Sequence, residues 1–320
     1  MTKHLPYWLG HALLLIGLSS ALAAEPESRK KIVVVHGTQE SYKEAATSLK
    51  AGLDTRNADS VAFELPAELD DDARAALIEK IREEKPDVVA TGGLEATLIV
   101  LEEMPGTPVT YFMVPNARDV LPNASPDQAN GLPGVTSDIS PADWISWIRE
   151  LQPDGKKVGL LFSERTRLTA TAIVDAARER NLNVQLIEAD GDNFPKAIDA
   201  LTSASCDSVL MIPDAKVYNG PNIQRLLLWG VRTKTPVWAF SPKIVKAGAP
   251  SGQYASSEDI GRQTAELVWK VCTDPAQAAT GIQYPEKASR ALNERTAEMV
   301  GLKISDRTRE KVSDRYGAEQ

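Results

Sequence analysis

Short apolar runs alternate with stretches of helical periodicity along most of this chain. Lys31–Val35 is a β-branched run of strand length, and the apolar residues after it recur at helical spacing as far as Leu53. Ser41 and Glu44 have the spacing of a capping box at the start of this helix. Because parallel strands need long connections, usually helices, the alternation predicts parallel sheets with helices on both faces.

The same pattern occurs in two series, separated by an aperiodic stretch at residues 115–133 that is rich in Pro and Asn. Two such series predict an α/β fold with two Rossmann-like lobes. The expected strands are residues 31–35, 60–65, 87–91, 108–112, 132–137, 158–162, 184–187, 208–212 and 236–240. The expected helices include 70–83, one that starts at a Ser140 cap followed by Pro141, 166–180, 193–203, 224–233 and 261–273.

The first 23 residues have the organisation of a secretory signal peptide. Lys3 and His4 precede the apolar residues 9–22, and the small residues Ala21 and Ala23 end the run. The run is short for a membrane span, which needs about 20 residues, although an uncleaved N-terminal anchor is the alternative interpretation. We therefore expect cleavage near Ala23 and an exported, freely diffusing protein.

Charge and composition argue against several partners and reactions. The chain has 36 Lys and Arg against 44 Asp and Glu, with no basic cluster that could follow a phosphate backbone, so we expect no nucleic-acid partner. After cleavage only His36 remains of the three histidines, which excludes two-histidine zinc motifs and leaves one candidate base. A lone histidine at a strand end is more typical of a structural residue. We expect no metal, no cofactor and no catalysis, with an α/β enzyme as the weaker alternative.

Ligands of open parallel sheets collect beyond the carboxyl ends of the strands, so the residues after each strand are candidates for binding. Gly92 and Gly93 precede a helix, where free N–H groups can receive a carboxylate, or where glycine serves only a tight turn. Asp138 and Asp214 could pair with a ligand ammonium or act as loop and capping residues. The candidate ligand-binding residues are Thr38, Gln39, Tyr42, Thr91, Gly92, Gly93, Phe112, Ser137, Asp138, Ser163, Asp214, Ser241 and Tyr254.

Several segments resemble one family of proteins. They are residues 132–141 (LPGVTSDISP), 150–153 (ELQP), 157–162 (KVGLLF), 246–249 (KAGA), 260–263 (IGRQ) and 291–302 (ALNERTAEMVGL). In these motifs the chain is similar to ABC-transporter substrate-binding proteins that have the type I periplasmic-binding-protein fold. The resemblance extends over about residues 31–311.

The resemblance implies two lobes with parallel sheets, joined by a three-strand hinge, that close on a small solute. Lobe one would comprise residues 31–137 plus 256–274, and lobe two residues 138–255 plus 275–320. The two cysteines, Cys206 and Cys272, allow one disulfide or two free thiols. Because they would fall in different lobes, where a disulfide opposes hinge motion, we expect free thiols.

Members of the family with an assigned ligand are often associated with aromatic amino acids. In such a mode a carboxylate would be held by Thr91, Gly92, Gly93 and Ser137, an ammonium by Asp214, and the side chain would face Tyr42, Phe112 or Tyr254. The family also implies a periplasmic monomer that delivers its solute to an ABC permease in the inner membrane. A ligand-sensing subunit for a membrane receptor or kinase is the alternative function.

Overall fold

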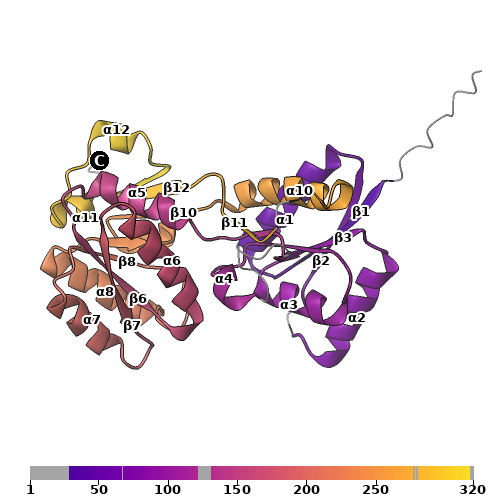
Figure 1. Ribbon diagram of the computed structural model, residues 1–320, viewed down its shortest axis with the longest axis horizontal. Coiled ribbons are helices and arrows are strands. Elements are labelled where there is room, and N and C mark those ends of the chain that lie inside the picture. Colours follow the sequence, from indigo (N-terminus) through magenta and orange to yellow (C-terminus); the bar gives the residue numbers. More distant parts are fainter. Residues whose placement is uncertain (1–28, 67, 122–130, 277, 279, 318–320) are drawn as a thin grey trace, which may run out of the picture.

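Two separate sheets organise the chain into two lobes that meet at a narrow waist (Figure 1). The computed structural model describes residues 29–66, 68–121, 131–276, 278 and 280–317, so the predicted signal peptide lies outside the described residues. Within this part of the chain, no helix combines the length and the apolarity that crossing a membrane requires.

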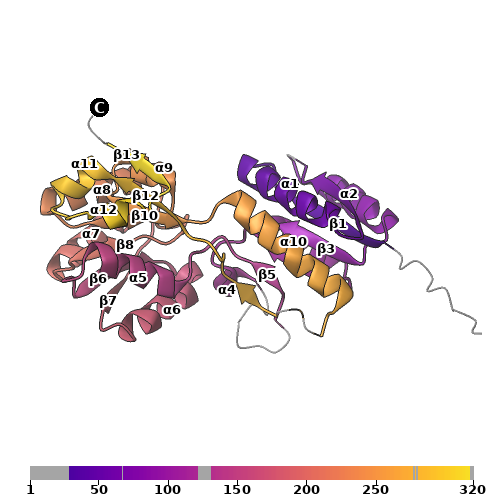
Figure 2. The same ribbon diagram turned by 90° about the horizontal axis from the view of Figure 1, so that it is seen from above.

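The first lobe is built on a parallel sheet in the order β11-β5-β4-β3-β1-β2. Its strands are β1 (Lys30–His36), β2 (Ala58–Glu64), β3 (Val88–Gly92), β4 (Val109–Phe112), β5 (Gly134–Val135) and β11 (Ile282–Gln283). Its helices are α1 (Glu40–Asp54), α2 (Asp71–Glu83), α3 (Leu94–Glu103), α4 (Ala117–Val120) and α10 (Ser257–Thr273). Helices α1 and α10 lie side by side on one face of the sheet (Figure 2). The apolar residues of α2 and α3 cover the other face.

The second lobe has a sheet in the order β13-β12-β10-β9-β8-β6-β7. Its strands are β6 (Lys157–Phe162), β7 (Asn183–Glu188), β8 (Ser208–Leu210), β9 (Val237–Ala239), β10 (Ser251–Tyr254), β12 (Ser289–Asn293) and β13 (Asp314–Tyr316). Its helices are α5 (Pro141–Leu151), the 3-10 turn η1 (Glu164–Thr166), α6 (Arg167–Arg178), α7 (Phe194–Ser203), α8 (Gly220–Thr233), α9 (Pro242–Ala247), α11 (Glu294–Met299) and α12 (Asp306–Arg309). The expected α/β architecture of two parallel-dominated sheets is confirmed.

Polar side chains set where most helices begin. Asp70 caps α2 by accepting a hydrogen bond from the N–H of Ala73, and Ser140 caps α5 in the same way, with Pro141 at the first helical position. The capping box at Ser41 was wrong: α1 begins one residue earlier, after Gln39, whose side chain makes no capping bond. The prediction had taken Ser41 outside the helix, whereas its main chain already continues the first turn.

Three crossovers join the lobes, between β5 and α5, between β10 and α10, and between β11 and β12. Residues 275–283, expected in lobe two, end in β11, which pairs with β5 in the sheet of the first lobe. β12 then enters the second lobe from the hinge. Because β10 ends at the hinge, β12 runs antiparallel to it, which departs from the expected all-parallel arrangement.

Candidate functional site

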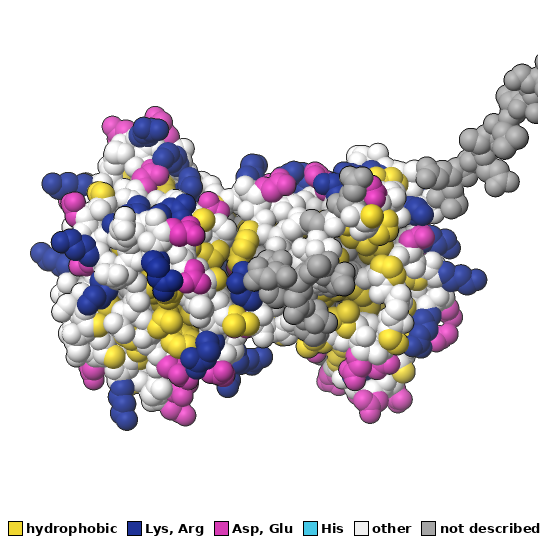
Figure 3. Space-filling view, in the orientation of Figure 1, with side chains coloured by type: hydrophobic (Ala, Val, Ile, Leu, Met, Phe, Trp, Pro, Cys, Tyr) yellow, Lys and Arg dark blue, Asp and Glu magenta, His cyan; other side chains and the backbone are white. Residues whose placement is uncertain are grey.

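A cleft of about 390 Å³ lies between the lobes, beyond the carboxyl ends of the strands. The first lobe contributes the start of α3 and the segment after β4, and the second lobe contributes the loops after β6, β8 and β9. Hydrophobic side chains gather on both sides of the waist where the lobes meet (Figure 3). The cleft is lined by Leu94, Pro115, Asn116, Val120, Arg165, Thr166, Pro213, Asp214, Ala215, Lys216, Tyr218 and Phe240.

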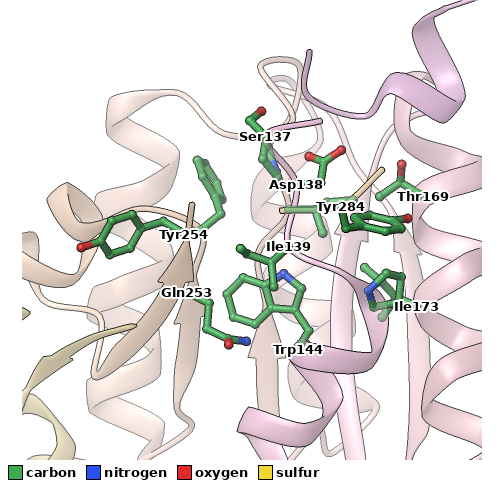
Figure 4. A pocket seen from close by; sticks show the side chains of 13 residues that line it. Ser137, Asp138, Ile139, Trp144, Thr169, Ile173, Gln253, Tyr254 and Tyr284 are labelled. Atoms are coloured by element: carbon green, nitrogen blue, oxygen red, sulfur yellow. The ribbon is translucent and has the colours of Figure 1, made fainter. Parts of the chain in front are cut away.

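A second, small pocket of about 30 Å³ lies at the hinge and is formed by the first and third crossovers, the end of β10 and other residues of the second lobe (Figure 4). Its lining is Ser137, Asp138, Ile139, Pro141, Trp144, Thr169, Ile173, Ile212, Pro213, Phe240, Gln253, Tyr254 and Tyr284. Pro213 and Phe240 line both spaces. The hinge pocket is therefore the inner end of the cleft.

Asp138 lies in the hinge pocket, on the crossover between β5 and α5. Its Oδ2 accepts hydrogen bonds from the N–H of Asn116 at 2.6 Å and from the Thr136 hydroxyl at 2.7 Å, whereas its buried Oδ1 has no partner among the residues that the structure describes. Burial raises the pKa of this carboxyl to about 6, against the opposing effect of the two hydrogen bonds. Asp138 is thus a carboxyl group that keeps one oxygen available at the hinge.

Asn116 connects the lobes. It has a left-handed backbone conformation with φ of 50°, and its Nδ2 donates to the carbonyl of Pro213 in the second lobe. Its main-chain N–H donates to Asp138, while no described residue is a partner of its buried Oδ1. Side chains from the first lobe, the hinge and the second lobe therefore meet at the inner end of the cleft.

Asp214 lines the cleft, but its oxygens serve its own lobe. Oδ2 accepts from the N–H of Ser163 at 3.0 Å and from the Thr166 hydroxyl at 2.7 Å, and Oδ1 accepts from the N–H of Lys216 at 2.9 Å and of Val217 at 3.4 Å. These four donors fix the loop after β8 against η1. Asp214 therefore acts as a loop and capping residue. The sequence analysis had left this role open as the alternative to pairing with a ligand ammonium group.

The turn after β3 is shaped by ring packing. A Cβ on Gly92 would lie 2.5 Å from the buried Phe112 ring, and one on Gly93, which has φ of 90°, would lie 2.9 Å from the Tyr42 ring. The Thr91 hydroxyl is fully buried and bonds to that of Thr97 at 2.9 Å. Phe112 belongs to the core of the first lobe. These contacts account for the residue types at the turn without a ligand.

Of the remaining candidates, Ser163, Ser241 and Tyr254 have partners within their own lobe. Ser163 caps η1, and Ser241 caps α9 through the N–H of Ile244. Tyr254 lines the hinge pocket with its ring, but its hydroxyl donates to Asp314 on β13 and is directed away from the other labelled residues in Figure 4. Ser137 lines the hinge pocket. Thr38 and Gln39 are exposed between β1 and α1.

His36 is buried at the end of β1, and its Nδ1 lies 2.9 Å from the carbonyl oxygen of Gly37. Among the described residues, no three His, Cys, Asp or Glu side chains come together as a metal site. Cys206 and Cys272 are both free, as expected.

Several residues that line the cleft were absent from the sequence-based candidates, namely Asn116, Arg165, Lys216 and Phe240. Each ends or follows a strand of the predicted sheets, so the rule that ligands gather at strand ends had indicated their segments. Small and hydroxylated residues had been favoured over the two cations, which belong to no recognisable motif.

Comparison with known proteins identifies the family and the fold. The model of the family described as ABC transporter substrate binding protein matches residues 30–314. No curated protein matches the chain. Solved structures with the same fold include an ABC domain from Streptococcus pneumoniae in complex with L-Trp, with 15% identity, a TM-score of 0.62 and coverage of 90% of this chain and 100% of that one. They also include the ligand-free, open form of a substrate-binding protein with adhesive properties from Clostridium difficile, with 15% identity, a TM-score of 0.68 and the same coverage.

Proposed function

The chain belongs to the family of ABC transporter substrate-binding proteins, and we propose that it captures a small solute between its lobes and delivers it to an ABC permease. The observation that supports this is the composition of the cleft: Leu94 and Asn116 come from one lobe, and Arg165 and Phe240 from the other. A solute that contacts both walls binds the closed arrangement better than the open one, so binding drives closure.

In this proposal the solute contacts the cleft and its inner end at the hinge. Ser137 and Asp138 line that inner end, and Asp138 Oδ1 and Asn116 Oδ1 are acceptors without a partner. The neighbour that binds L-Trp makes amino acids the first compounds to test. Because the oxygens of Asp214 are occupied, Asp138 is the better partner for any donor group of the solute.

A steric block tests whether the cleft is the binding site. Ala215 is exposed and lines the cleft, so Ala215→Trp would fill it without disturbing the core, whereas Ala247→Trp places the same side chain on an exposed position of α9. In a thermal-shift screen of amino acids, organic acids, sugars and polyamines, a solute at about 100 times its Kd adds about 2.7 kcal/mol of stability. We expect Ala215→Trp to lose the response and Ala247→Trp to keep it. Stabilisation by no solute, or an unchanged response in Ala215→Trp, contradicts the proposal.

Delivery to a permease and export need their own measurements. We expect deletion of the gene to abolish uptake of the radiolabelled solute, and complementation with Ala247→Trp, but not Ala215→Trp, to restore it. We further expect the mature protein in the periplasm, as a monomer whose sequence begins after Ala23. Uptake that persists in the deletion strain would argue against transport and for a sensing role.

A further inference from the structure

The wall that the second lobe contributes to the cleft carries unpaired positive charge. Arg165 lies in η1 after β6, and Lys216 lies in the loop after β8; both are exposed and both line the cleft. β6 and β8 are adjacent strands, so these two loops are neighbours at the same edge of the sheet. The guanidinium group of Arg165 and the ammonium group of Lys216 therefore lie on the same side of the cleft, although the chain as a whole has a net charge of −8.

Neither cation has a partner among the described residues. Glu164, the neighbour of Arg165, pairs instead with Arg167, which also contacts Glu188. Asp214, the acidic residue in the cleft lining, bonds to the main-chain N–H of Lys216 rather than to its ammonium group. Both side chains are thus free to bind an anion that enters the cleft.

Tyr218 supplies a second, independent observation. Its ring packs between those of Phe194 and Phe240, with centroid distances of 6.4 and 6.2 Å, and the residue is only 7% exposed. Its hydroxyl is buried and has no hydrogen-bond partner within the part of the chain that the structure describes, although the residue lines the cleft beside the two cations. A buried hydroxyl without a partner costs free energy, which a ligand oxygen at this point would recover.

The rest of the cleft lining is largely apolar. Leu94 and Val120 of the first lobe and Phe240 of the second lobe provide carbon surface around the polar groups. A solute that suits this combination has an anionic group at one end and an apolar body.

We propose that the cleft selects organic carboxylates, whose anionic group binds Arg165, Lys216 and the Tyr218 hydroxyl of the second lobe, and that an amino group on the solute is not required. This inference rests on the proposed function and specifies its solute class. It reverses the orientation expected from the sequence, in which the turn at Gly92 and Gly93 held the carboxylate. Arg165 can bind two carboxylate oxygens at once, and Lys216 adds a point charge.

Compounds matched in shape and varied in charge test the inference. Calorimetry at pH 7 would compare 3-phenylpropionate, its neutral amide, L-phenylalanine and 2-phenylethylamine, and in parallel gluconate, glucose 6-phosphate and glucose. We expect the carboxylates to bind best, 3-phenylpropionate among them although it has no amino group, the amide and the amine to bind at least tenfold more weakly, and affinity to fall as salt rises. A preference for glucose 6-phosphate over every carboxylate in the series would overturn the assignment of the anionic group as a carboxylate.

Variants that lack one positive charge test whether Arg165 and Lys216 bind the carboxylate. We expect Arg165→Gln and Lys216→Gln each to weaken binding of the best carboxylate about tenfold or more. Arg225→Gln and Lys196→Gln remove an exposed, unpaired Arg and Lys elsewhere on the same lobe and should leave affinity unchanged. A best binder without an anionic group, or an Arg165→Gln/Lys216→Gln variant that binds as before, overturns the inference and leaves solute binding intact. Absence of binding from every class overturns the proposed function and the inference with it.

Discussion

Asp119 of the first lobe caps a helix of the second lobe through Thr169. Its Oδ2 accepts hydrogen bonds from the main-chain N–H of Thr169 at 2.9 Å and from the Thr169 hydroxyl at 2.6 Å, and its Oδ1 accepts from the N–H of Leu168 at 2.6 Å. Thr166, at the N-cap position of α6, makes no capping bond with its side chain. Asp119 of α4 therefore takes the place of a local N-cap for α6, although it belongs to the other lobe.

Replacing Asp119 by Ala is expected to loosen the contact between the lobes. Because the N–H groups at the start of α6 lose their acceptor, we expect a loss of about 1 kcal/mol in unfolding experiments. We also expect a larger radius of gyration by small-angle X-ray scattering, since this contact holds the lobes near each other. Asp175→Ala, which removes an exposed carboxylate near the other end of α6, should change neither quantity. An unchanged radius of gyration would show that the crossovers alone set the spacing of the lobes.

The raised pKa of Asp138 predicts how stability depends on pH. Between the ordinary value of 3.8 and about 6, the folded protein binds a proton that the unfolded chain has already released. Stability from this group is therefore greatest below pH 4 and falls as pH rises towards 6, by on the order of 2 kcal/mol. Tyr111 and Tyr284 face the same carboxylate but stay neutral throughout this range, because the ordinary tyrosine pKa of 10.0 lies far above it and burial raises both pKa values further.

Asp138→Asn should remove this part of the pH dependence, since the amide cannot ionise but can still accept from Thr136 and Asn116. Urea unfolding at pH 4, 5, 6 and 7 measures how the free energy of unfolding depends on pH. At pH 7 we expect Asp138→Asn to be more stable than the unchanged chain. Asp192→Asn, a change on an exposed loop, serves as the control and should keep the original slope. Equal slopes in all three proteins would mean that Asp138 ionises as freely in the folded state as in the unfolded one.

The parts of the fold that the sequence predicted correctly are those with a local signal. β1 is buried at five consecutive residues, and the matching apolar run is plain in the sequence. β13, by contrast, has the sequence Asp-Arg-Tyr, and its pairing with β12 depends on a distant part of the chain. No pattern within these three residues indicates that they form a strand of this sheet.

The candidate site shows the same limit more strongly. Asp214 follows a strand as a ligand residue would, and only the three-dimensional contacts with Ser163 and Thr166 show that its oxygens are taken. Tyr254 likewise follows its strand into the hinge pocket, but Asp314, sixty residues later, determines where its hydroxyl points. Strand ends identify the segments of a site, whereas the direction of each side chain depends on partners far away in sequence.

The two cysteines should behave as unpaired thiols, that of Cys206 buried and that of Cys272 half-buried. Cys206 belongs to the core of the second lobe, Cys272 lies in α10 of the first, and both are free. Burial raises the pKa of both thiols, that of Cys272 to about 12, so few thiolates exist at pH 8. We expect slow alkylation of the folded protein, rapid modification at both sites in urea, and a Tm that reducing agent does not change. Cys272→Ser should lose one of the two modifications. A mass 2 Da lower than calculated, restored by reduction, would contradict this.

Gly92 tests whether the turn after β3 is shaped by packing. A Cβ at this position would lie 2.5 and 2.7 Å from two ring atoms of Phe112, which is fully buried and cannot move freely. We expect Gly92→Ala to cost about 1–3 kcal/mol in urea unfolding, the range typical of overpacking. Gly220→Ala, at a helix start where no atom lies within 4 Å of the new Cβ, should cost nothing.

If the ring is the cause, Phe112→Leu combined with Gly92→Ala will be less destabilising than the sum of the two single changes, because the smaller side chain makes room for the methyl group. Strict additivity would point instead to the Cβ of His36, 3.0 Å from the new methyl group, which Phe112→Leu leaves in place.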